Sequence, residues 1–299
     1  MTLATESRPR LPAPPRAATG ALVWIEGRRM LRHPAPWLGL VLSAWWVHST
    51  YDQPWTGARY TGLVPALTPL LLGISLASLS AFGRELVPVA DEAPMDLARR
   101  SYARLLAGIV LVALTTVIVV AGEVWLRLHG GLDLGDEPGR TLHAHYTLPE
   151  LIQPVLLAAL AVVAGATVVH LLRQRLVASI VVVVGWFLFG ATYWLFDATV
   201  VRWLVPIQPQ PMVVEIGSWD TDPTTFPASW LLSAPGEYQD FWARLVVSPT
   251  VAAWHDVYLV GLITVLVGIA VPGRLRPFFL VGGLLVAAAA LLLQQAVAP

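Results

Sequence analysis

The sequence predicts an all-α, polytopic transmembrane helix bundle, and three observations support this prediction. Of the 299 residues, 56% are hydrophobic and only 13% are charged, against about 25% charged residues in soluble domains. Apolar runs long enough to cross a bilayer recur along the whole chain. The basic residues, all 19 of which are arginine, fall mainly in alternate loops between these runs.

Seven segments have the composition of membrane spans, and we expect each to be a helix. They are 36–50, 62–83, 104–127, 150–172, 177–196, 254–272 and 277–295. The segments 104–127 and 177–196 are apolar on every face, which excludes the surface helices of a soluble protein. The last segment, 277–295, either crosses the membrane or lies against the bundle, and the sequence leaves both possibilities open.

The placement of arginine predicts the direction of the bundle. If the N-terminus lies inside, fourteen arginines fall on the inner side and five on the outer side, as the positive-inside rule requires. The inner ones are Arg8, Arg10, Arg16, Arg28, Arg29, Arg32, Arg84, Arg99, Arg100, Arg104, Arg173, Arg175, Arg274 and Arg276. We therefore expect a multi-pass protein of the cell (inner or plasma) membrane with a cytoplasmic N-terminus.

Two different segments precede the first predicted span. Residues 1–16 are rich in Pro and Arg, which predicts a disordered cytoplasmic tail. Residues 17–35 predict an amphipathic helix in the inner membrane interface, because apolar residues lie on one face and arginines lie on the opposite face. The apolar face holds Val23, Trp24, Gly27, Met30 and Leu31, and the opposite face holds Arg28, Arg29 and Arg32. The alternative is a cytoplasmic extension of the first span, but Pro34 and Pro36 disfavour a continuous helix.

Residues 84–103 form the one sizeable loop predicted on the cytoplasmic side. The loop, RELVPVADEAPMDLARRSYA, is dense in charge, and Asp91 or Asp96 is suited to cap a short helix. One interpretation is a docking element for a soluble partner, and the other is a solvated connector. The residues alone favour neither.

The predicted outer segments carry histidine, aromatic residues and proline. His129, His143 and His145 lie in 128–149, and a His-x-His pair can bind a metal, but the spacing supplies no further ligand. We therefore expect no metal site there. Segment 197–253 is too aromatic for a disordered loop and too rich in Pro to span. We expect short helices in the outer interface that act as an exit gate or as a lid.

The sequence also argues against ATP binding by the common loop and against a proton relay in this chain. The chain contains no lysine, so a phosphate-binding loop ending in G-K-[ST] is impossible. Ionisable residues are missing from the middle of the predicted spans, which disfavours a proton relay. Glu123, Asp197 and Asp256 fall near outer ends, and His170 falls near an inner end. A powered function would therefore need an energy source in another chain.

The order of these elements resembles the integral-membrane permeases of ABC exporters of the second type, particularly the actinobacterial multidrug and antibiotic-resistance forms. Three features are similar to that family. They are the stretch WIEGRRMLRHPAPW at 24–37, the charged loop after the second span, and SPTVAAWHDVYLVGL at 248–262. The family core has six spans, so a seventh helix at 277–295 is a departure.

The resemblance implies a transport subunit of an ATP-driven exporter rather than an enzyme. Residues 36–299 would be the permease domain, 17–35 its elbow helix, and 197–253 its outer re-entrant segment. A coupling helix within 84–103 would contact a separate ABC ATPase subunit, which binds ATP and Mg, and a second permease chain would complete the substrate path. No cofactor, catalytic residue or nucleic-acid partner is expected in this chain. The residues expected to make charged contacts with the ATPase are Glu85, Asp91, Glu92, Asp96, Arg99 and Arg100.

Two other interpretations are compatible with the sequence. The first is a membrane-embedded enzyme or accessory subunit with an outer-face site built from Asp220, Asp222, His143 or His145. The second is a structural membrane anchor of a larger complex. The substrate of a transporter of this kind cannot be read from the sequence.

Overall fold

The computed structural model describes seven stretches of the chain: 16–50, 62–86, 95–132, 145–195, 203–208, 213–215 and 245–297. Eight α-helices and a short 3-10 helix, η1, lie within them. The helices are α1 (Arg16–Arg32), α2 (Pro34–Thr50), α4 (Leu63–Gly83), α5 (Leu97–Leu128), α6 (Leu148–Leu172), α7 (Arg175–Leu195), α8 (Pro249–Ala270) and α9 (Arg276–Val297), with η1 at Arg84–Leu86. The all-helical membrane bundle predicted from the sequence is confirmed.

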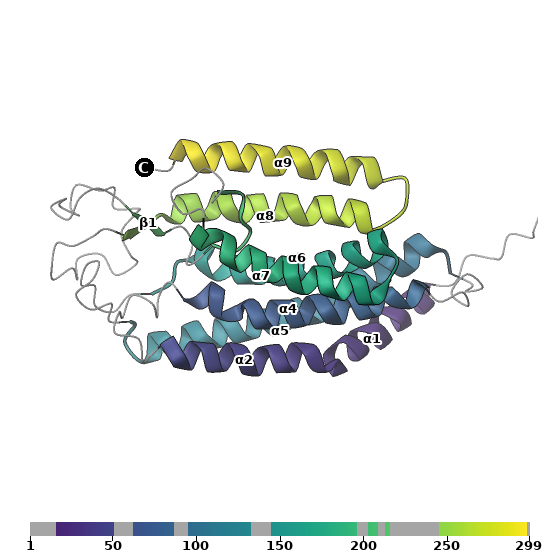
Figure 1. Cartoon of the computed structure of the whole chain (residues 1–299), viewed down its shortest axis with the longest axis horizontal. Coiled ribbons are helices and arrows are strands. Elements are labelled where there is room, and N and C mark those ends of the chain that lie inside the picture. The colour runs from purple at the N-terminus through teal and green to yellow at the C-terminus, as the bar shows by residue number, and fades with distance from the viewer. Residues whose placement is uncertain are drawn as a thin grey trace, which may run out of the picture.

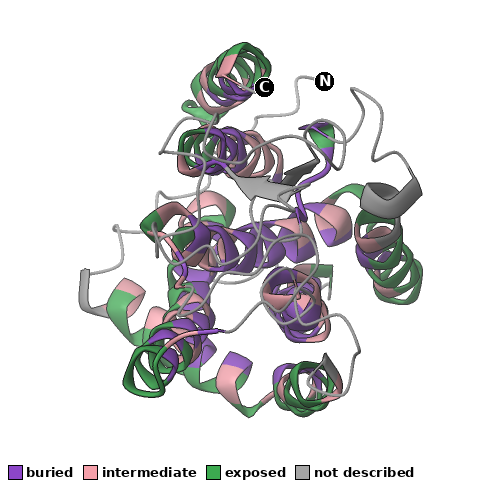
Figure 2. Cartoon of the chain, turned by 90° about the vertical axis from the view of Figure 1, so that its left-hand side faces the viewer, coloured by how far each residue is buried: buried purple, intermediate pink, exposed green. Residues whose placement is uncertain are grey.

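Seven of these helices lie side by side as rods whose direction alternates along the chain (Figure 1). The helices α2, α4, α6, α8 and α9 form a row in which each packs on the next, and α5 and α7 flank this row on opposite sides (Figures 1 and 2). The helix α1 runs at an angle to α2 and packs mainly on α5. Each rod matches one of the seven predicted spans.

Five helices within the described stretches are long and apolar enough to cross a membrane. They are the helical segments Leu63–Leu86, Leu97–Leu128, Leu148–Leu172, Pro249–Ala270 and Arg276–Val297. The segment Arg175–Gly190 of α7 is apolar but shorter, and α2 has 17 residues. The chain is therefore a multi-pass bundle of membrane-spanning type.

The lipid-facing and protein-facing sides of the helices are clearly separated. Buried residues gather where the helices meet, and exposed residues cover their outward faces (Figure 2). Many exposed side chains are large and apolar, among them Val117, Phe187 and Leu284, each more than 60% exposed. An apolar outer surface of this extent suits hydrocarbon rather than water.

Small residues let the central helix α4 lie very close to its neighbours. A Cβ at Gly73 would meet the Ala35 carbonyl oxygen of α2 at 2.3 Å, and one at Gly165 of α6 would meet the Ser75 oxygen of α4 at 2.2 Å. Hydrogen bonds add to this packing, since Ser75 Oγ donates to the Ala161 oxygen at 2.9 Å and accepts from Trp186 Nε1 at 2.7 Å. Close backbone approach and side-chain hydrogen bonds are what hold helices together within lipid.

Close packing at glycine also attaches the last helix, α9, to α8. A Cβ at Gly261 of α8 would lie 2.6 Å from the backbone nitrogen of Ala287 in α9, and one at Gly283 would lie 2.7 Å from the Val265 nitrogen. The segment 277–295, for which the sequence left two possibilities, thus packs along α8 as an antiparallel rod with the length of a span.

Two details differ from the sequence-based expectation. The helix α5 begins at Leu97, so the loop predicted at 84–103 is shorter, and Asp96 caps α5 by accepting from the Arg99 backbone N–H at 2.8 Å. Within 197–253, a short antiparallel pair joins β1 (Val213–Glu215) to β2 (Leu245–Val247), where we expected short helices.

The glycine contact between α8 and α9 gives a direct test of the fold. We expect Gly261→Leu to lower the unfolding free energy by about 1–3 kcal/mol, because the new side chain overlaps the backbone of α9. Gly282→Leu is the matched control, since a Cβ at Gly282 meets nothing within 4 Å. Thermal unfolding of the purified protein in detergent should show a lower midpoint for the first variant only. Equal midpoints for both variants would contradict the α8–α9 packing.

Candidate functional site at the arginine-rich end

The helix α1 buries an acidic residue, Glu26, which is only 1% exposed. Val23, Glu26, Gly27 and Met30 follow helical spacing and together form the face turned toward the bundle. Gly27 allows close approach to α5, because a Cβ there would lie 3.6 Å from the Ala107 carbonyl oxygen. The carboxylate of Glu26 is therefore held between α1 and the helices on which α1 packs, α5 and α4.

Arginines from two other elements neutralise this carboxylate. Arg84, in η1 at the end of α4, makes an ion pair and hydrogen bond with Glu26. Arg104 of α5 lies with its Nε 3.7 Å from Glu26 Oε1, and its side chain is only 9% exposed. Arg29 of α1 lies 3.4 Å away but is largely exposed. Three segments of the chain therefore meet at one buried carboxylate.

A second carboxylate extends this cluster along α5. Glu85 of η1 pairs with Arg104, and its Oε2 lies 3.1 Å from Arg100 Nη2. The side chains of Glu85 and Arg100 are 13% and 11% exposed. We call Glu26, Arg84, Glu85, Arg100 and Arg104 the ion network. Because Arg104 contacts both acids, the network is continuous from α1 through η1 to α5.

The turn between α1 and α2 lies beside the network. His33 interrupts the two helices, and its Nδ1 accepts from the Ala35 backbone N–H at 3.3 Å, in the manner of a helix cap. Pro34 occupies the first position of α2, where a missing N–H costs nothing. Burial and the nearby Arg84 charge lower the pKa of His33. A neutral imidazole at this turn is consistent with its role as an acceptor.

The structure brings together only part of the residue set predicted for ATPase contacts. Glu85 and Arg100 pair with each other inside the ion network. Asp96 caps α5 and is exposed, and Arg99 lies in the first turn of that helix. Asp91 and Glu92 lie outside the described residues. A contact between this set and a partner stays a prediction, but Glu85 and Arg100 already have partners within the chain.

The sequence-based set missed Glu26, Arg84 and Arg104. A signal for Glu26 was present, because it is the one acidic residue between Glu6 and Asp52 and its spacing places it beside Met30 on the inward face of α1. The partners Arg84 and Arg104 are 58 and 78 residues away in sequence, so their meeting at Glu26 required the fold.

A second buried polar cluster lies at the opposite end of the bundle. His255 of α8 is fully buried between Gln294 of α9, at 3.2 Å, and the Pro206 carbonyl oxygen, at 3.1 Å. Tyr258 donates to the Leu204 oxygen at 2.7 Å, and Gln153 of α6 donates to the Gln208 oxygen at 3.5 Å. The short segment 203–208 is thus fixed against the ends of α6 and α8.

Residues proposed for other chemistry are only partly covered by the structure. His143, Asp220 and Asp222 lie outside the described residues, so an outer-face enzyme site stays a prediction. His129 stacks on Trp125 with ring centroids 4.3 Å apart. In the described part of the chain, no group of three or more His, Asp or Glu side chains is placed to hold a metal ion.

Comparison with known proteins identifies no relative: no family model, no curated protein and no solved structure matches this chain.

The ion network predicts a large effect of removing Glu26. We expect Glu26→Gln to lower the unfolding free energy by about 3–5 kcal/mol, because Arg84 then loses its carboxylate partner and the buried Arg104 keeps only Glu85. The double variant Glu26→Leu/Arg104→Leu should recover most of this loss, since it removes the buried Glu26–Arg104 pair as a unit while Glu85 keeps Arg100. Thermal unfolding in detergent measures both effects. A double variant as unstable as the sum of the two single variants would contradict the pairing.

Proposed function

We propose that this chain is the membrane permease subunit of an ATP-driven exporter of the second ABC type. A second permease chain would complete the substrate path, and a separate ATPase would bind ATP and Mg²⁺. The proposal rests on the family resemblance of the sequence and on one structural observation, the ion network that joins α1 and η1 to α5. The membrane-embedded enzyme and the anchor subunit are the alternatives.

The helix α5 supplies a mechanical reason for the proposal. With 32 residues it is about 48 Å long, whereas the hydrocarbon layer is about 30 Å thick. The helix is thus longer than the hydrocarbon layer, and its first turns carry the charged residues Arg99, Arg100 and Arg104. A force applied near residues 84–100 would act on α1, η1 and α5 together, because the ion network holds these three elements to one another.

This arrangement suits alternating access driven from outside the chain. Closure of an ATPase dimer would displace the ends of α4 and α5, and helices as rigid as α5 would carry the motion across the membrane. The chain itself has no lysine and so cannot form the common ATP-binding loop. A partner ATPase therefore supplies the energy in this proposal.

The test is purification of the tagged protein in a mild detergent, followed by an ATPase assay and identification of the proteins that accompany it. We expect a co-purifying ATPase that is lost from the variant Asp91→Lys/Glu92→Lys. These residues are chosen because they belong to the predicted contact set and are not members of the ion network. The variant should unfold at the wild-type temperature.

The matched control reverses the same acidic pair in a loop predicted on the other side of the membrane, Asp136→Lys/Glu137→Lys. This variant should retain the ATPase. A chain that purifies without any ATPase would refute the proposal and favour the enzyme or anchor interpretation. Loss of the ATPase from the control as well would refute the location of the contact.

A further inference from the structure

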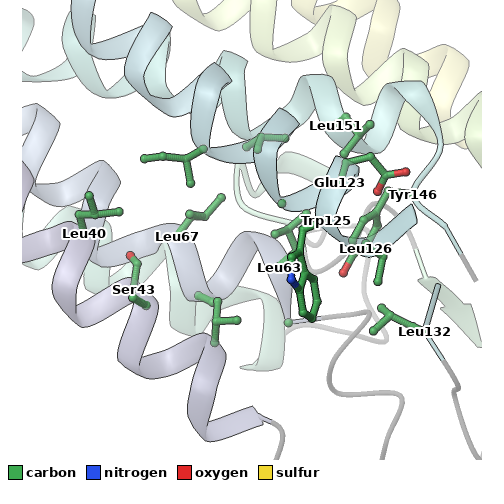
Figure 3. A pocket seen from close by; sticks show the side chains of 17 residues that line it. Leu40, Ser43, Leu63, Leu67, Glu123, Trp125, Leu126, Leu132, Tyr146 and Leu151 are labelled. Atoms are coloured by element: carbon green, nitrogen blue, oxygen red, sulfur yellow. The ribbon is translucent and has the colours of Figure 1, made fainter. Parts of the chain in front are cut away.

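An apolar cavity of about 360 Å³ opens at the arginine-poor end of the bundle, between α2, α4, α5 and the start of α6 (Figure 3). Its walls are mostly aliphatic, with Leu40, Leu67 and Leu126 among them. The aromatic side chains of Trp125 and Tyr146 also line it. Both α2 and α5 pack on α4. At the arginine-rich end α1 packs on α5, whereas at the opposite end this cavity lies between α2 and α5. Its volume lies within the range of small-molecule sites.

One acidic side chain, Glu123 of α5, lines this apolar cavity. Glu123 is only 7% exposed, and among the described residues its Oε2 has no hydrogen-bond partner. A carboxylate within a membrane span is costly unless a cation compensates it, and such residues mark binding sites and substrate paths. The cavity therefore combines an apolar wall with a buried carboxylate, one oxygen of which has no hydrogen-bond partner among the described residues.

The cation that accompanies Glu123 is placed so that it can be replaced. Arg127 lies one helical turn further along α5, with its Nε 2.6 Å from Glu123 Oε1. Its side chain is 57% exposed and so reaches out of the cavity toward the surface. A long arginine side chain near a helix end can turn its charge to the headgroup region instead. A bound cation would then take the place of Arg127 beside Glu123.

We propose that this cavity binds a lipophilic organic cation, with its apolar body against the aliphatic wall and its charge beside Glu123. The aromatic rings of Trp125 and Tyr146, which line the cavity, also favour a cation, because their π-electron density attracts positive charge. As a statement about the transported substrate, this inference rests on the proposed exporter function. As a statement about binding, it holds for the chain alone.

The test uses tetraphenylphosphonium and tetraphenylborate, which have nearly the same shape and opposite charge. Equilibrium dialysis with the purified chain in a non-ionic detergent, without nucleotide or ATPase, measures binding of each ion above a protein-free detergent control. We expect the wild-type protein to bind the phosphonium and not the borate. Glu123→Gln should weaken phosphonium binding at least tenfold, whereas Arg127→Gln should strengthen it because the competing cation is gone.

Two further variants separate binding in the cavity from effects on folding. Gly122→Phe keeps the carboxylate but fills the cavity, since a Cβ at Gly122 meets nothing within 4 Å, and it should abolish phosphonium binding. Asp256→Asn removes another buried acid, one outside the cavity lining, and should bind as the wild type does.

Wild-type affinity in Glu123→Gln, or equal binding of both ions by the wild-type protein, would overturn this inference. Neither result depends on the ATPase. Failure of cation binding and failure of the exporter proposal are therefore distinguishable.

Discussion

The arrangement of the arginine-rich end follows from the burial of one carboxylate. Glu26 is held away from water on the inward face of α1, and a buried charge of this kind is stable only when it is paired. The pairing brings Arg84 from the end of α4 and Arg104 from α5 to the same point. Glu85 and Arg100 then extend the contact along α5. An amphipathic helix that its apolar face alone would hold loosely is thereby fixed to the bundle.

The rest of the bundle is held by a different means. Lipid offers no hydrophobic driving force between helices, so close packing of small residues and hydrogen bonds must stabilise it. Gly73, Gly165 and Gly261 let helix backbones approach closely, and Ser75 connects α4 to both α6 and α7. The helix α5 contributes to both functional candidates. Its first turns belong to the ion network, and its last turns line the cavity that holds Glu123.

The positions of the long helices could be predicted from the sequence, because the hydropathy of a segment depends only on its own residues. The predicted starts of six spans fall within a few residues of the observed helices. The exception is 104–127, because the arginines Arg99, Arg100 and Arg104 mark the start of the apolar run. Arginine is nevertheless a good helix former, and α5 begins earlier, at Leu97. The ion network and the cavity were beyond prediction, because each is assembled from segments far apart in the chain. The helical spacing of Glu26 from Met30 signals an inward-facing acid, but it does not show which arginines pair with it.

The source of energy for transport tests the account most directly. Inside-out membrane vesicles that contain the chain and the proposed ATPase partner can be supplied either with ATP or with a proton gradient and no ATP. Uptake of tetraphenylphosphonium then reports transport from the cytoplasmic side. We expect uptake that requires ATP, persists when a protonophore collapses the gradient, and is absent from vesicles without the chain. Uptake that proceeds without ATP and stops on addition of the protonophore would contradict it.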